Sequence, residues 1–470
     1  DDMSCDSVGV FGSKLEGTTP VMDRLASQSL RFEYAHVTVG NCNPCRNVMF
    51  SGLISHNNKV EGFYKVPEPG WPHMVDLLKD AGYYTGIHGK VTHSSPYQPY
   101  AWDEDLTISP SGKKADIKDA KAYGASTARG IAQAKALGQP FFLSINISDP
   151  HKPFWSQVRG GGEDPYIPSK IFTADEVPVP GFLFDDPEVR QELALYYSSV
   201  RRADDCLGAV LQALKKSGDW DNTMLVFLSD HGMPLPFAKT QLYHHSTRTP
   251  LMVRIPGVTK AGKVDKQHMV SVLDLLPTVL DTLKIEKPNR LDGRSFYPLL
   301  KGEKQEGWDY VIKQYHENSG RSRDPMRAIQ TKTHLYLFNP WSNGERVFAT
   351  ATNGTVTCKR MIALAEEDEE MNQRLELYRF RVPQELYQVK RDPDCLENLI
   401  DYSSKSKEKR RLQKLLEDWM VRTGDPILEC FQKRDDPEFV EAYVQKLEAE
   451  ANARRKAEKP PKKAKVKKKS

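Results

Sequence analysis

Residues 222–232 read NTMLVFLSDHG, an apolar run that ends abruptly in Ser-Asp-His-Gly. A second run of this kind, PFFLSINIS at residues 140–148, leads into Asp-Pro-His. Short apolar runs rich in branched and aromatic residues are typical of strands that are buried on both faces, as in the parallel sheets of α/β proteins. The two stretches therefore predict strands at the centre of a sheet.

Helical and strand-like patterns alternate around these two stretches over the first 300 residues. Residues 19–30 predict a helix with Thr19 as N-cap and Pro20 at its first position. Residues 187–217 predict a long amphipathic helix. Further predicted elements are strands at 30–37, 83–90 and 251–257 and helices at 71–82 and 270–283. Such alternation predicts an α/β sandwich around a mostly parallel sheet for residues 1–305.

The pattern changes after about residue 305, where we expect a smaller C-terminal α+β domain over residues 306–435. It would hold short antiparallel strands at 309–317, 326–331 and 334–338 and a helix at 410–420. Residues 436–470 predict a helix that runs into a Lys-rich tail, disordered after about residue 450. Such a tail either only keeps the protein soluble or retains it near polyanions such as sulfated glycans.

Three predicted strands end in chemically active side chains. They are followed by GKVTH at residues 89–93, SDPH at 148–151 and SDHG at 229–232. Polar sites gather beyond the carboxyl ends of strands in sheets of this kind. One such aspartate often only caps the next helix, but three strand ends that deliver Lys, His and Asp together predict a functional site.

The stretch NCNPCRNVMFSGL at residues 41–53 places Cys42 and Cys45 three positions apart. A Cys-x-x-Cys pair at a helix start suits thiol–disulfide exchange, but no thioredoxin-like unit surrounds it. A zinc site needs two further ligands, and no other pair has suitable spacing. The seven cysteines are also too sparse for a disulfide scaffold. A third interpretation rests on the pattern Cys-x-Pro-x-Arg, formed by Cys42, Pro44 and Arg46.

With this third pattern the chain resembles the sulfatases of the alkaline phosphatase superfamily. Six more blocks follow the family's order: TPVMDRLASQSLRFEYAHV, DLLKDAGYYTGIHGK, SDPHKPF, SDHG, VLDLLPTVLD with LDGRSFYPLLKG, and ELYQVKRDPDCLENL. Residues 229–257 look most like the heparan N-sulfatase (sulfamidase) branch. The resemblance implies an alkaline-phosphatase-like α/β/α sandwich with a large mixed, mostly parallel sheet, and a C-terminal α+β domain with an antiparallel sheet.

The resemblance also implies cofactors. In the family the cysteine at the position of Cys42 is oxidised after translation to formylglycine (3-oxoalanine), which makes a formylglycine-generating enzyme a maturation partner. One Ca²⁺ would be held by three carboxylates, one imidazole and the modified residue, because hard cations prefer oxygen ligands. The matching metal positions are Asp1, Asp2, Cys42, Asp230 and His231.

Six positions match the family's catalytic residues, the first being the nucleophile at Cys42. Arg46, Lys90 and Lys239 match cations that hold the modified side chain and the sulfate. His93 matches the base that releases sulfate, and His151 matches the group that donates a proton to the leaving group.

Four residues are candidates for substrate binding, each with an alternative. Asp149 either contacts the sugar or fixes the turn before His151. One of His244 and His245 contacts substrate, or both are surface histidines near Lys239. Arg248 is a ligand or a salt-bridge residue. Asn146 and Asn353 begin glycosylation sequons at the frequency expected by chance.

The leading hypothesis is removal of sulfate from a sulfated glycan, with N-sulfoglucosamine of heparan-sulfate-type substrates expected first. One alternative is an O-sulfatase, for example one like iduronate-2-sulfatase, that acts on another sulfated polysaccharide. Another is an inactive glycan-binding pseudosulfatase with unmodified Cys42. Oligomeric state is left open.

Charge and hydropathy limit the kinds of partner and the cellular location that the sequence predicts. No run of 18 apolar residues predicts a transmembrane helix. The net charge of +4 comes from the tail, where the last 20 residues hold ten Lys/Arg against one Glu, so no specific nucleic-acid partner is predicted. The abrupt start DDMSC indicates a natural protein with an apolar strand before Asp1 and a lost signal peptide. The expected location is secreted, periplasmic or lysosomal.

Overall fold

The computed structural model describes residues 1–158, 160–318 and 323–458, and the strands of their N-terminal part form two sheets. Four strands pair in the order β5 (Leu225–Phe227), β6 (Leu251–Arg254), β1 (Leu30–His36) and β7 (Val264–Ser271). Within this sheet only β6 runs against its neighbours. The second sheet, β3 (Glu104–Asp105), β2 (Tyr84–His88) and β4 (Phe141–Ile145), is parallel throughout.

Two predictions about the central strands are corrected by this arrangement. One large sheet was expected, whereas β4 lies at the edge of the three-stranded sheet and β5 at the edge of the four-stranded one. Both strands were expected to be buried on both faces, but all their residues are half-buried. An edge strand has a neighbour on one side only, so its side chains lose part of their cover.

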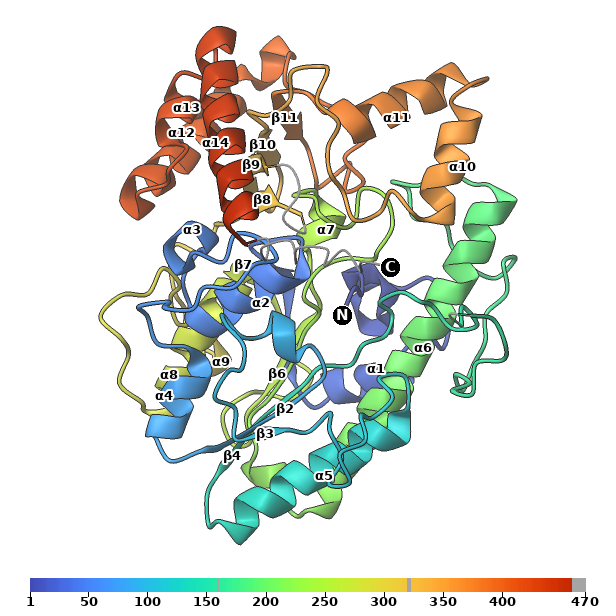
Figure 1. Cartoon of the computed structure of the whole chain (residues 1–470), viewed down its shortest axis with the longest axis vertical. Coiled ribbons are helices and arrows are strands. Elements are labelled where there is room, and N and C mark those ends of the chain that lie inside the picture. The colour runs from blue at the N-terminus through green and yellow to red at the C-terminus, as the bar shows by residue number, and fades with distance from the viewer. Residues whose placement is uncertain (159, 319–322, 459–470) are drawn as a thin grey trace, which may run out of the picture.

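Helices cover the sheets on two sides, as Figure 1 shows. One group comprises α1 (Pro20–Ala26), α5 (Ala120–Ala136) and α6 (Pro187–Lys216), and the other comprises α2 (Cys42–Ser51), α4 (Met74–Asp80), α8 (Leu275–Leu283) and α9 (Tyr297–Leu300). Short helices α3 (Ser55–Asn58) and α7 (His244–Thr247) lie near the C-terminal part. The long helix expected from residue 187 is confirmed as α6, where Asp186 accepts a hydrogen bond from the Glu188 N–H at 2.9 Å.

The expected antiparallel C-terminal sheet is present in the order β11 (Gln384–Tyr387), β10 (Leu335–Phe338), β9 (Arg323–Thr331), β8 (Tyr310–Glu317). Side chains alternate across it, because successive residues of a strand point to opposite faces. Leu335 and Leu337 join the core of the N-terminal part, whereas Tyr336 and Phe338 join a second apolar cluster with α12 (Ser406–Thr423) and α13 (Leu428–Gln432). The first of these clusters therefore forms a core that extends through both parts of the chain.

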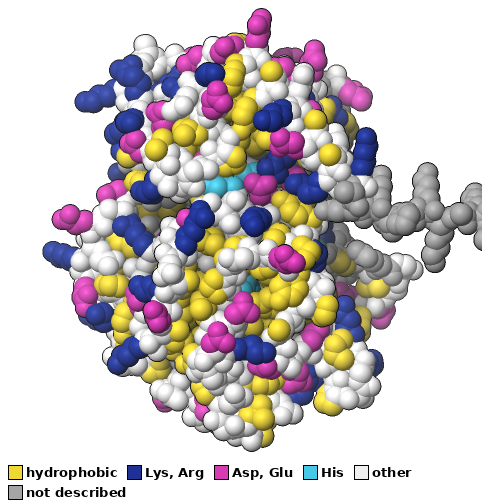
Figure 2. All heavy atoms as spheres, turned by 60° about the vertical axis from the view of Figure 1, so that its left-hand side comes forward, with side chains coloured by type: hydrophobic (Ala, Val, Ile, Leu, Met, Phe, Trp, Pro, Cys, Tyr) yellow, Lys and Arg dark blue, Asp and Glu magenta, His cyan; other side chains and the backbone are white. Residues whose placement is uncertain are grey.

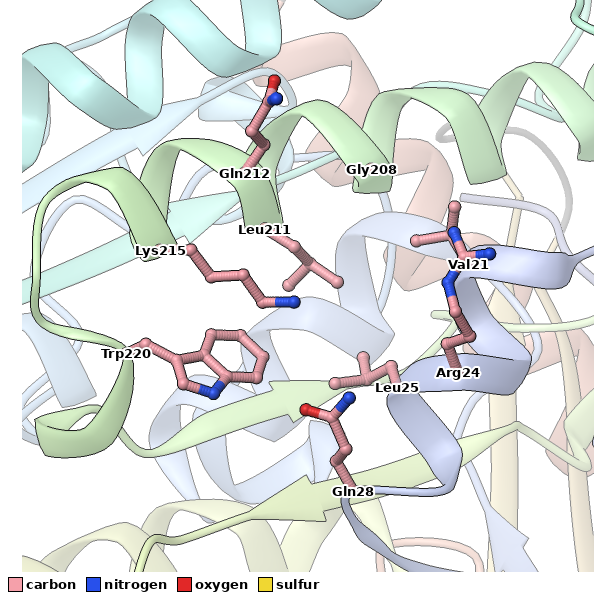
Figure 3. A pocket seen from close by; sticks show the side chains of 9 residues that line it. All are labelled: Val21, Arg24, Leu25, Gln28, Gly208, Leu211, Gln212, Lys215 and Trp220. Atoms are coloured by element: carbon pink, nitrogen blue, oxygen red, sulfur yellow. The ribbon is translucent and has the colours of Figure 1, made fainter.

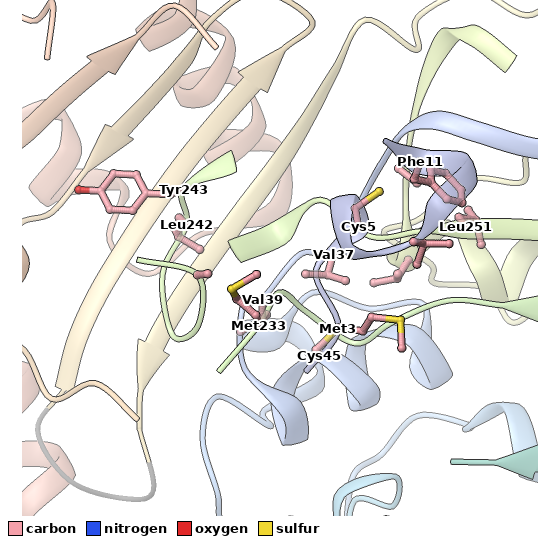
Figure 4. Close-up of a cluster of buried hydrophobic side chains, with 14 of the residues drawn as sticks. Met3, Cys5, Phe11, Val37, Val39, Cys45, Met233, Leu242, Tyr243 and Leu251 are labelled. Carbon is pink, nitrogen blue, oxygen red and sulfur yellow. The ribbon is translucent and has the colours of Figure 1, made fainter. Parts of the chain in front are cut away.

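Part of that core lies next to the chain start. Figure 4 shows Met3, Cys5, Val39 and Cys45 among the apolar side chains of this cluster, together with Met233 from the segment after β5. The cluster packs the N-terminal residues, helix α2 and the segment after β5 against one another. The residues that adjoin these three segments in sequence are therefore held close together.

The C-terminal helix is longer than expected. Disorder was predicted after about residue 450, but α14 (Pro437–Glu458) continues through eight further residues. Tertiary contacts explain the difference, because Arg454 donates a hydrogen bond to Glu317 at 2.5 Å and lies over the Tyr64 ring at 4.1 Å. Residues 459–470, which carry most of the predicted tail, lie outside the described residues.

Two further helices lie between strands β10 and β11 of the antiparallel sheet: α10 (Val356–Leu364) and α11 (Glu369–Phe380).

Charges of both signs cover the surface in Figure 2, with histidine side chains visible between the upper and lower parts. Among the described residues, no helix combines the length and the apolar character that crossing a membrane requires.

One fully buried ion pair joins the C-terminal sheet to its helices. Arg327 of β9 donates to both carboxylate oxygens of Asp425, at 2.5 and 2.8 Å, and neither side chain is exposed. Burial alone would raise the pKa of Asp425, but the Arg327 guanidinium outweighs it and holds the pKa below its ordinary value. A charge left alone here would have no water to replace its partner.

We predict that Asp425→Ala lowers the free energy of unfolding by about 3–5 kcal/mol, because it leaves Arg327 buried and unpaired. Urea denaturation measures this. The control is Asp418→Ala, which removes the exposed Lys414–Asp418 pair and should cost less than about 1 kcal/mol. Similar small losses in both variants would contradict the prediction.

Candidate active site

Cys42 is the first residue of helix α2, where free backbone N–H groups and the helix dipole favour a negative charge. Asn41 is the N-cap, and its side-chain oxygen accepts a hydrogen bond from the Cys42 N–H at 3.1 Å. Gly40 permits a close crossing, since a Cβ there would lie 2.4 Å from the Gln241 carbonyl oxygen. The expected nucleophile thus lies at a helix N-terminus and beside the 239–246 loop.

Four of the five expected metal positions come together around Cys42. Ligand atoms of Asp1, Asp2, Cys42 and His231 all lie within 4.8 Å of one another. His231 Nε2 is 3.1 Å from Asp2 Oδ1 and 3.3 Å from Cys42 Sγ. The fifth, Asp230, lies alongside, with Oδ1 3.8 Å from His231 Nε2 and accepting the Asp2 N–H at 3.2 Å.

The donor set fits a hard divalent cation. Asp2 Oδ1 is buried and accepts no hydrogen bond, which leaves an oxygen available for a metal ion. Carboxylate oxygens of this kind are the ligands that Ca²⁺ prefers. The cysteine sulfur stands where an oxygen would stand after conversion of the residue to an aldehyde hydrate.

The three predicted cations each lie beside a carboxylate of this group. Arg46 donates to Asp230 from Nε at 3.0 Å, and a terminal nitrogen lies 2.9 Å from the same carboxylate oxygen in an ion pair. Lys239 Nζ lies 2.6 Å from Asp2 Oδ2, and Lys90 forms an ion pair with Asp1. Because each carboxylate has a cationic partner, the attraction between opposite charges offsets the cost of removing them from water.

The two cysteines of α2 have opposite electrostatic surroundings. Burial raises the pKa of the Cys42 thiol, but Lys239, Lys90 and His231 outweigh burial and hold this pKa well below its ordinary value. Burial and the nearby Asp230 raise the pKa of Cys45 well above its ordinary value. Cys45 packs in the apolar cluster of Figure 4. Of the two sulfurs, it is Cys42 Sγ that contacts the charged group, at 3.3 Å from His231 Nε2.

His151 follows β4 and is oriented by its own backbone neighbour. Its Nδ1 lies 2.7 Å from the Lys152 carbonyl oxygen, which can only accept, so Nδ1 carries the proton and Nε2 is the acceptor of the neutral ring. Burial lowers the pKa of His151 to about 4, against an opposing effect of Asp2.

Asp149 fixes the turn before His151, which is one of the two roles that the sequence left open for it. Arg202 of α6 donates to it at 2.6 Å, and Lys118 donates both to Asp149 at 2.5 Å and to the His151 carbonyl at 2.8 Å. With both oxygens engaged by cations, Asp149 is committed to this turn. Lys118 and Arg202 were not predicted, because they are distant in sequence and belong to no motif.

His93 lies in a short 3-10 helix, Val91–His93, directly after Lys90. Its carbonyl accepts a hydrogen bond from Asn47 of α2 at 3.2 Å, and its ring lies 5.4 Å from that of Phe63. Its Nδ1 is buried and makes no hydrogen bond. The residue is therefore held against α2 by its backbone, with a ring nitrogen still available.

The other three substrate-binding candidates bond elsewhere. His244 Nδ1 lies 2.8 Å from Gln330 Nε2, and His245 Nε2 lies 3.0 Å from Asp394. Both histidines are largely buried, so the alternative of surface histidines is wrong. Arg248 forms a salt bridge with Glu33 at 2.9 Å, as its alternative held. We carry none of the three into the proposed mechanism.

Asn146 was missed as a site residue, since the sequence marked it only as a chance sequon. Its Oδ1 accepts a hydrogen bond from Arg46 at 2.7 Å. The available signal was its position, one residue after β4 and two before SDPH.

A separate hollow of about 240 Å³ lies between α1 and the end of α6, with Leu25, Lys215 and Trp220 on its wall (Figure 3). It shares no residue with the charged group around Cys42, so we do not assign the chemistry to it.

Comparison with known proteins identifies the class of protein to which this fold and this group of paired charges belong. The Sulfatase family profile matches residues 1–285, more than half of the chain, so the chain belongs to the sulfatase family. A second profile, N-sulphoglucosamine sulphohydrolase, C-terminal, matches residues 230–343. The chain is 29% identical over 454 residues to N-sulphoglucosamine sulphohydrolase of Homo sapiens, covering 87% of this chain and 86% of that protein.

Solved structures share the fold. A 2-O GAG sulfatase superposes with a TM-score of 0.65 at 22% identity, covering 90% of this chain and 91% of the other. A protein in complex with its substrate D-glucosamine-2-N,6-O-disulfate gives 0.66 at 18% identity, covering 91% and 97%. The predicted class of enzyme, a sulfatase, is thereby confirmed, and so is the predicted fold class, apart from the division of its large sheet into two.

We predict that Asp149→Ala speeds amide hydrogen exchange over residues 147–153 roughly tenfold or more, because two buried cations lose their partner and the turn can open locally. Hydrogen-exchange mass spectrometry measures this. Asp205→Ala is the control: it removes hydrogen bonds to Ser169 at the surface and should leave residues 147–153 unchanged. Unchanged exchange in Asp149→Ala would show that the turn does not depend on these ion pairs.

Proposed function

We propose that the protein removes sulfate from a sulfated glycan, with N-sulfoglucosamine of heparan-sulfate-type chains as its first substrate, through a formylglycine made from Cys42. The observation that carries this proposal is the position of Cys42, at a helix N-terminus and within 4.8 Å of three metal-ligating groups. The similarity of 87% of the chain to human N-sulphoglucosamine sulphohydrolase supports the substrate, as does the match of residues 230–343 to that family's C-terminal profile.

Two groups would complete the site. Converted to formylglycine, residue 42 supplies a hydrated aldehyde with one hydroxyl for attack on sulfur and a second that permits release of sulfate. A Ca²⁺ ion held by Asp1, Asp2, Asp230 and His231 would supply a Lewis acid for a sulfate oxygen. A formylglycine-generating enzyme is the maturation partner that this requires, and the secreted, periplasmic or lysosomal location stays a prediction.

The cations of the chain do the electrostatic work. Lys90 and Lys239 each pair with a carboxylate beside Cys42, and Arg46 is fixed by Asp230. A sulfate group brought to Cys42 therefore meets three positive side chains. Charge that develops on its oxygens in the transition state is offset by groups that are already oriented, which is the most effective form of electrostatic stabilisation.

His151 is suited to the leaving group. With Nδ1 donating to the Lys152 carbonyl, Nε2 is the atom that holds the transferable proton in the cationic ring. Burial keeps the ring mostly neutral in the free protein, and the negative charge of a bound sulfate raises the pKa of His151 toward neutrality. The proton is needed most when an amine leaves, as it does from N-sulfoglucosamine. We propose His93 as the base for sulfate release.

We predict that the intact protein from a host with the maturation enzyme weighs about 18 Da less than its sequence, because an aldehyde replaces the Cys42 thiol. Cys42→Ala should abolish release of sulfate from N-sulfoglucosamine, and Cys45→Ser should retain it, since Cys45 faces the apolar core. Mass spectrometry and a sulfate-release assay check both.

The rival functions give different results in the same assays. A loss of about 2 Da indicates a Cys42–Cys45 disulfide; that loss, or an unchanged mass, without turnover supports a pseudosulfatase. Full modification with release only from O-sulfated sugars supports the O-sulfatase alternative.

A further prediction concerns pH. Only the protonated His151 can donate, and its pKa lies at about 4, so its protonated fraction falls as pH rises above that value. We expect kcat/KM for N-sulfoglucosamine to fall steadily between about pH 5 and 8, and His151→Gln to be slow with this dependence lost. His268→Gln, which alters a histidine paired with Asp265, is the control and should keep the wild-type profile. A falling profile that persists in His151→Gln would assign the proton to another group.

A further inference from the structure

Asn146 lies where β4 ends and contacts two other elements of the site. Its Oδ1 accepts from a terminal nitrogen of Arg46 at 2.7 Å. Its Nδ2 lies 3.2 Å from the His88 carbonyl oxygen and 3.0 Å from the Gly89 carbonyl oxygen, at the end of β2. The side chain therefore bridges helix α2, which carries Cys42, and the turn that leads into Lys90.

The orientation of the Asn146 amide is fixed by the chemistry around it. Nδ2 also lies 3.3 Å from the Ser144 carbonyl oxygen and 3.2 Å from its hydroxyl. Three of these four neighbours are carbonyls that can only accept, so the NH₂ group must face them. The carbonyl oxygen is then directed at Arg46, which can only donate. A carboxylate or a hydrocarbon could not satisfy both sides.

Arg46 depends on this contact for its direction. Its Nε and one terminal nitrogen bind Asp230, so Asn146 supplies the partner of the remaining terminal nitrogen. Asn146 holds a separate edge of the planar guanidinium. Without it, Arg46 would keep its ion pairs with Asp230 and, at 3.6 Å, with Asp1, and would move with those carboxylates.

The Lys90 side of the contact is equally close. The Asn146 backbone N–H donates to the His88 carbonyl at 2.8 Å, and a Cβ on Gly89 would lie 2.7 Å from the Asn146 carbonyl oxygen. Gly89 adopts a φ of 70° and Lys90 a φ of 50°, so the chain turns sharply here to bring Lys90 to Asp1. Asn146 holds the start of that turn through hydrogen bonds of both its backbone and its side chain.

We propose that Asn146 is a positioning residue that sets the directions of Arg46 and Lys90 toward a bound sulfate. The proposal rests on the proposed function, which gives these two cations their role. It assigns to Asn146 no contact with substrate. Its effect is on geometry, and a displacement of about 1 Å in a catalytic group can lower a rate by about a hundredfold.

The test is a double-mutant cycle on kcat/KM for N-sulfoglucosamine. Asn146→Ala should lower kcat/KM roughly 10- to 100-fold in the wild type. In an Arg46→Lys background the same substitution should cost only a few-fold, because the orientation of Arg46 is already lost and only the smaller effect through Lys90 remains. Equal losses in both backgrounds would indicate a general structural defect and overturn the proposal, as would wild-type kcat/KM in Asn146→Ala.

A matched control is Asn339→Ala, which removes another buried amide, bonded to the Val382 carbonyl at 2.8 Å and Glu385 at 2.6 Å in the C-terminal part. It should lower the melting temperature and leave kcat/KM unchanged. If Asn146→Ala does not fold, the isosteric Asn146→Asp replaces it. This variant places a carboxylate oxygen against three backbone carbonyls and should lower kcat/KM at least about tenfold; a value within about threefold of the wild type would overturn the proposal.

Affinity for inorganic sulfate separates this proposal from the proposed function. Calorimetry measures it without turnover, and Asn146→Ala should weaken it by about tenfold, since two sulfate-facing cations lose their orientation. If the wild type cleaves no sulfated sugar, the proposed function fails while the calorimetric comparison still decides the role of Asn146. Unchanged sulfate affinity in Asn146→Ala overturns the positioning role.

Discussion

The constraint on which this structure depends is charge compensation in a buried place. Asp2 and Asp230 are almost inaccessible to water, and so are Arg46 and Lys239. A buried ion without a partner would cost several kcal/mol, so each of these side chains has to lie in contact with an opposite charge. The ends of β2, β4 and β5, the start of α2 and the chain start all meet here for that reason. The sheets bring these residues together, and their mutual neutralisation makes the burial tolerable.

Much of this arrangement could be predicted from the sequence because strand ends and motifs are local signals. The runs before SDPH and SDHG gave the positions of His151 and Asp230, and the Cys-x-Pro-x-Arg pattern gave Cys42 and Arg46. What failed depends on tertiary contacts. The half-burial of β4 and β5 follows from their places at sheet edges, which periodicity does not encode. The inward packing of His244 depends on Gln330, which lies 86 residues away. The final turns of α14 are held by Glu317, 137 residues away.

The C-terminal part belongs to the site as well as to the core. Asn41, the N-cap of the helix that begins with Cys42, donates from Nδ2 to Asn318 Oδ1 at 3.4 Å. Glu317 beside it binds Arg454, and Glu61 of the N-terminal part binds Arg323 of β9 at 2.6 Å. These polar contacts and the shared apolar cluster fix β8 and β9 against the start of α2. A change in the C-terminal sheet would therefore be transmitted to the helix that begins with Cys42, although no catalytic side chain that we propose comes from that sheet.

The contrast between Cys42 and Cys45 shows that the surroundings of a cysteine decide its reactivity more than the motif that contains it. Both thiols lie within the first turn or so of one helix and are nearly inaccessible to solvent. Lys239, Lys90 and His231 stabilise a negative charge on Cys42, while Cys45 meets the apolar cluster of Met3 and Val39. Exchange chemistry between two cysteines requires both sulfurs to reach a common partner, and here the surroundings favour ionisation of one and suppress that of the other. The same helix start that would activate a redox pair thus serves a single residue, and the charges that lower the pKa of its thiol are the ones that a sulfate group would meet.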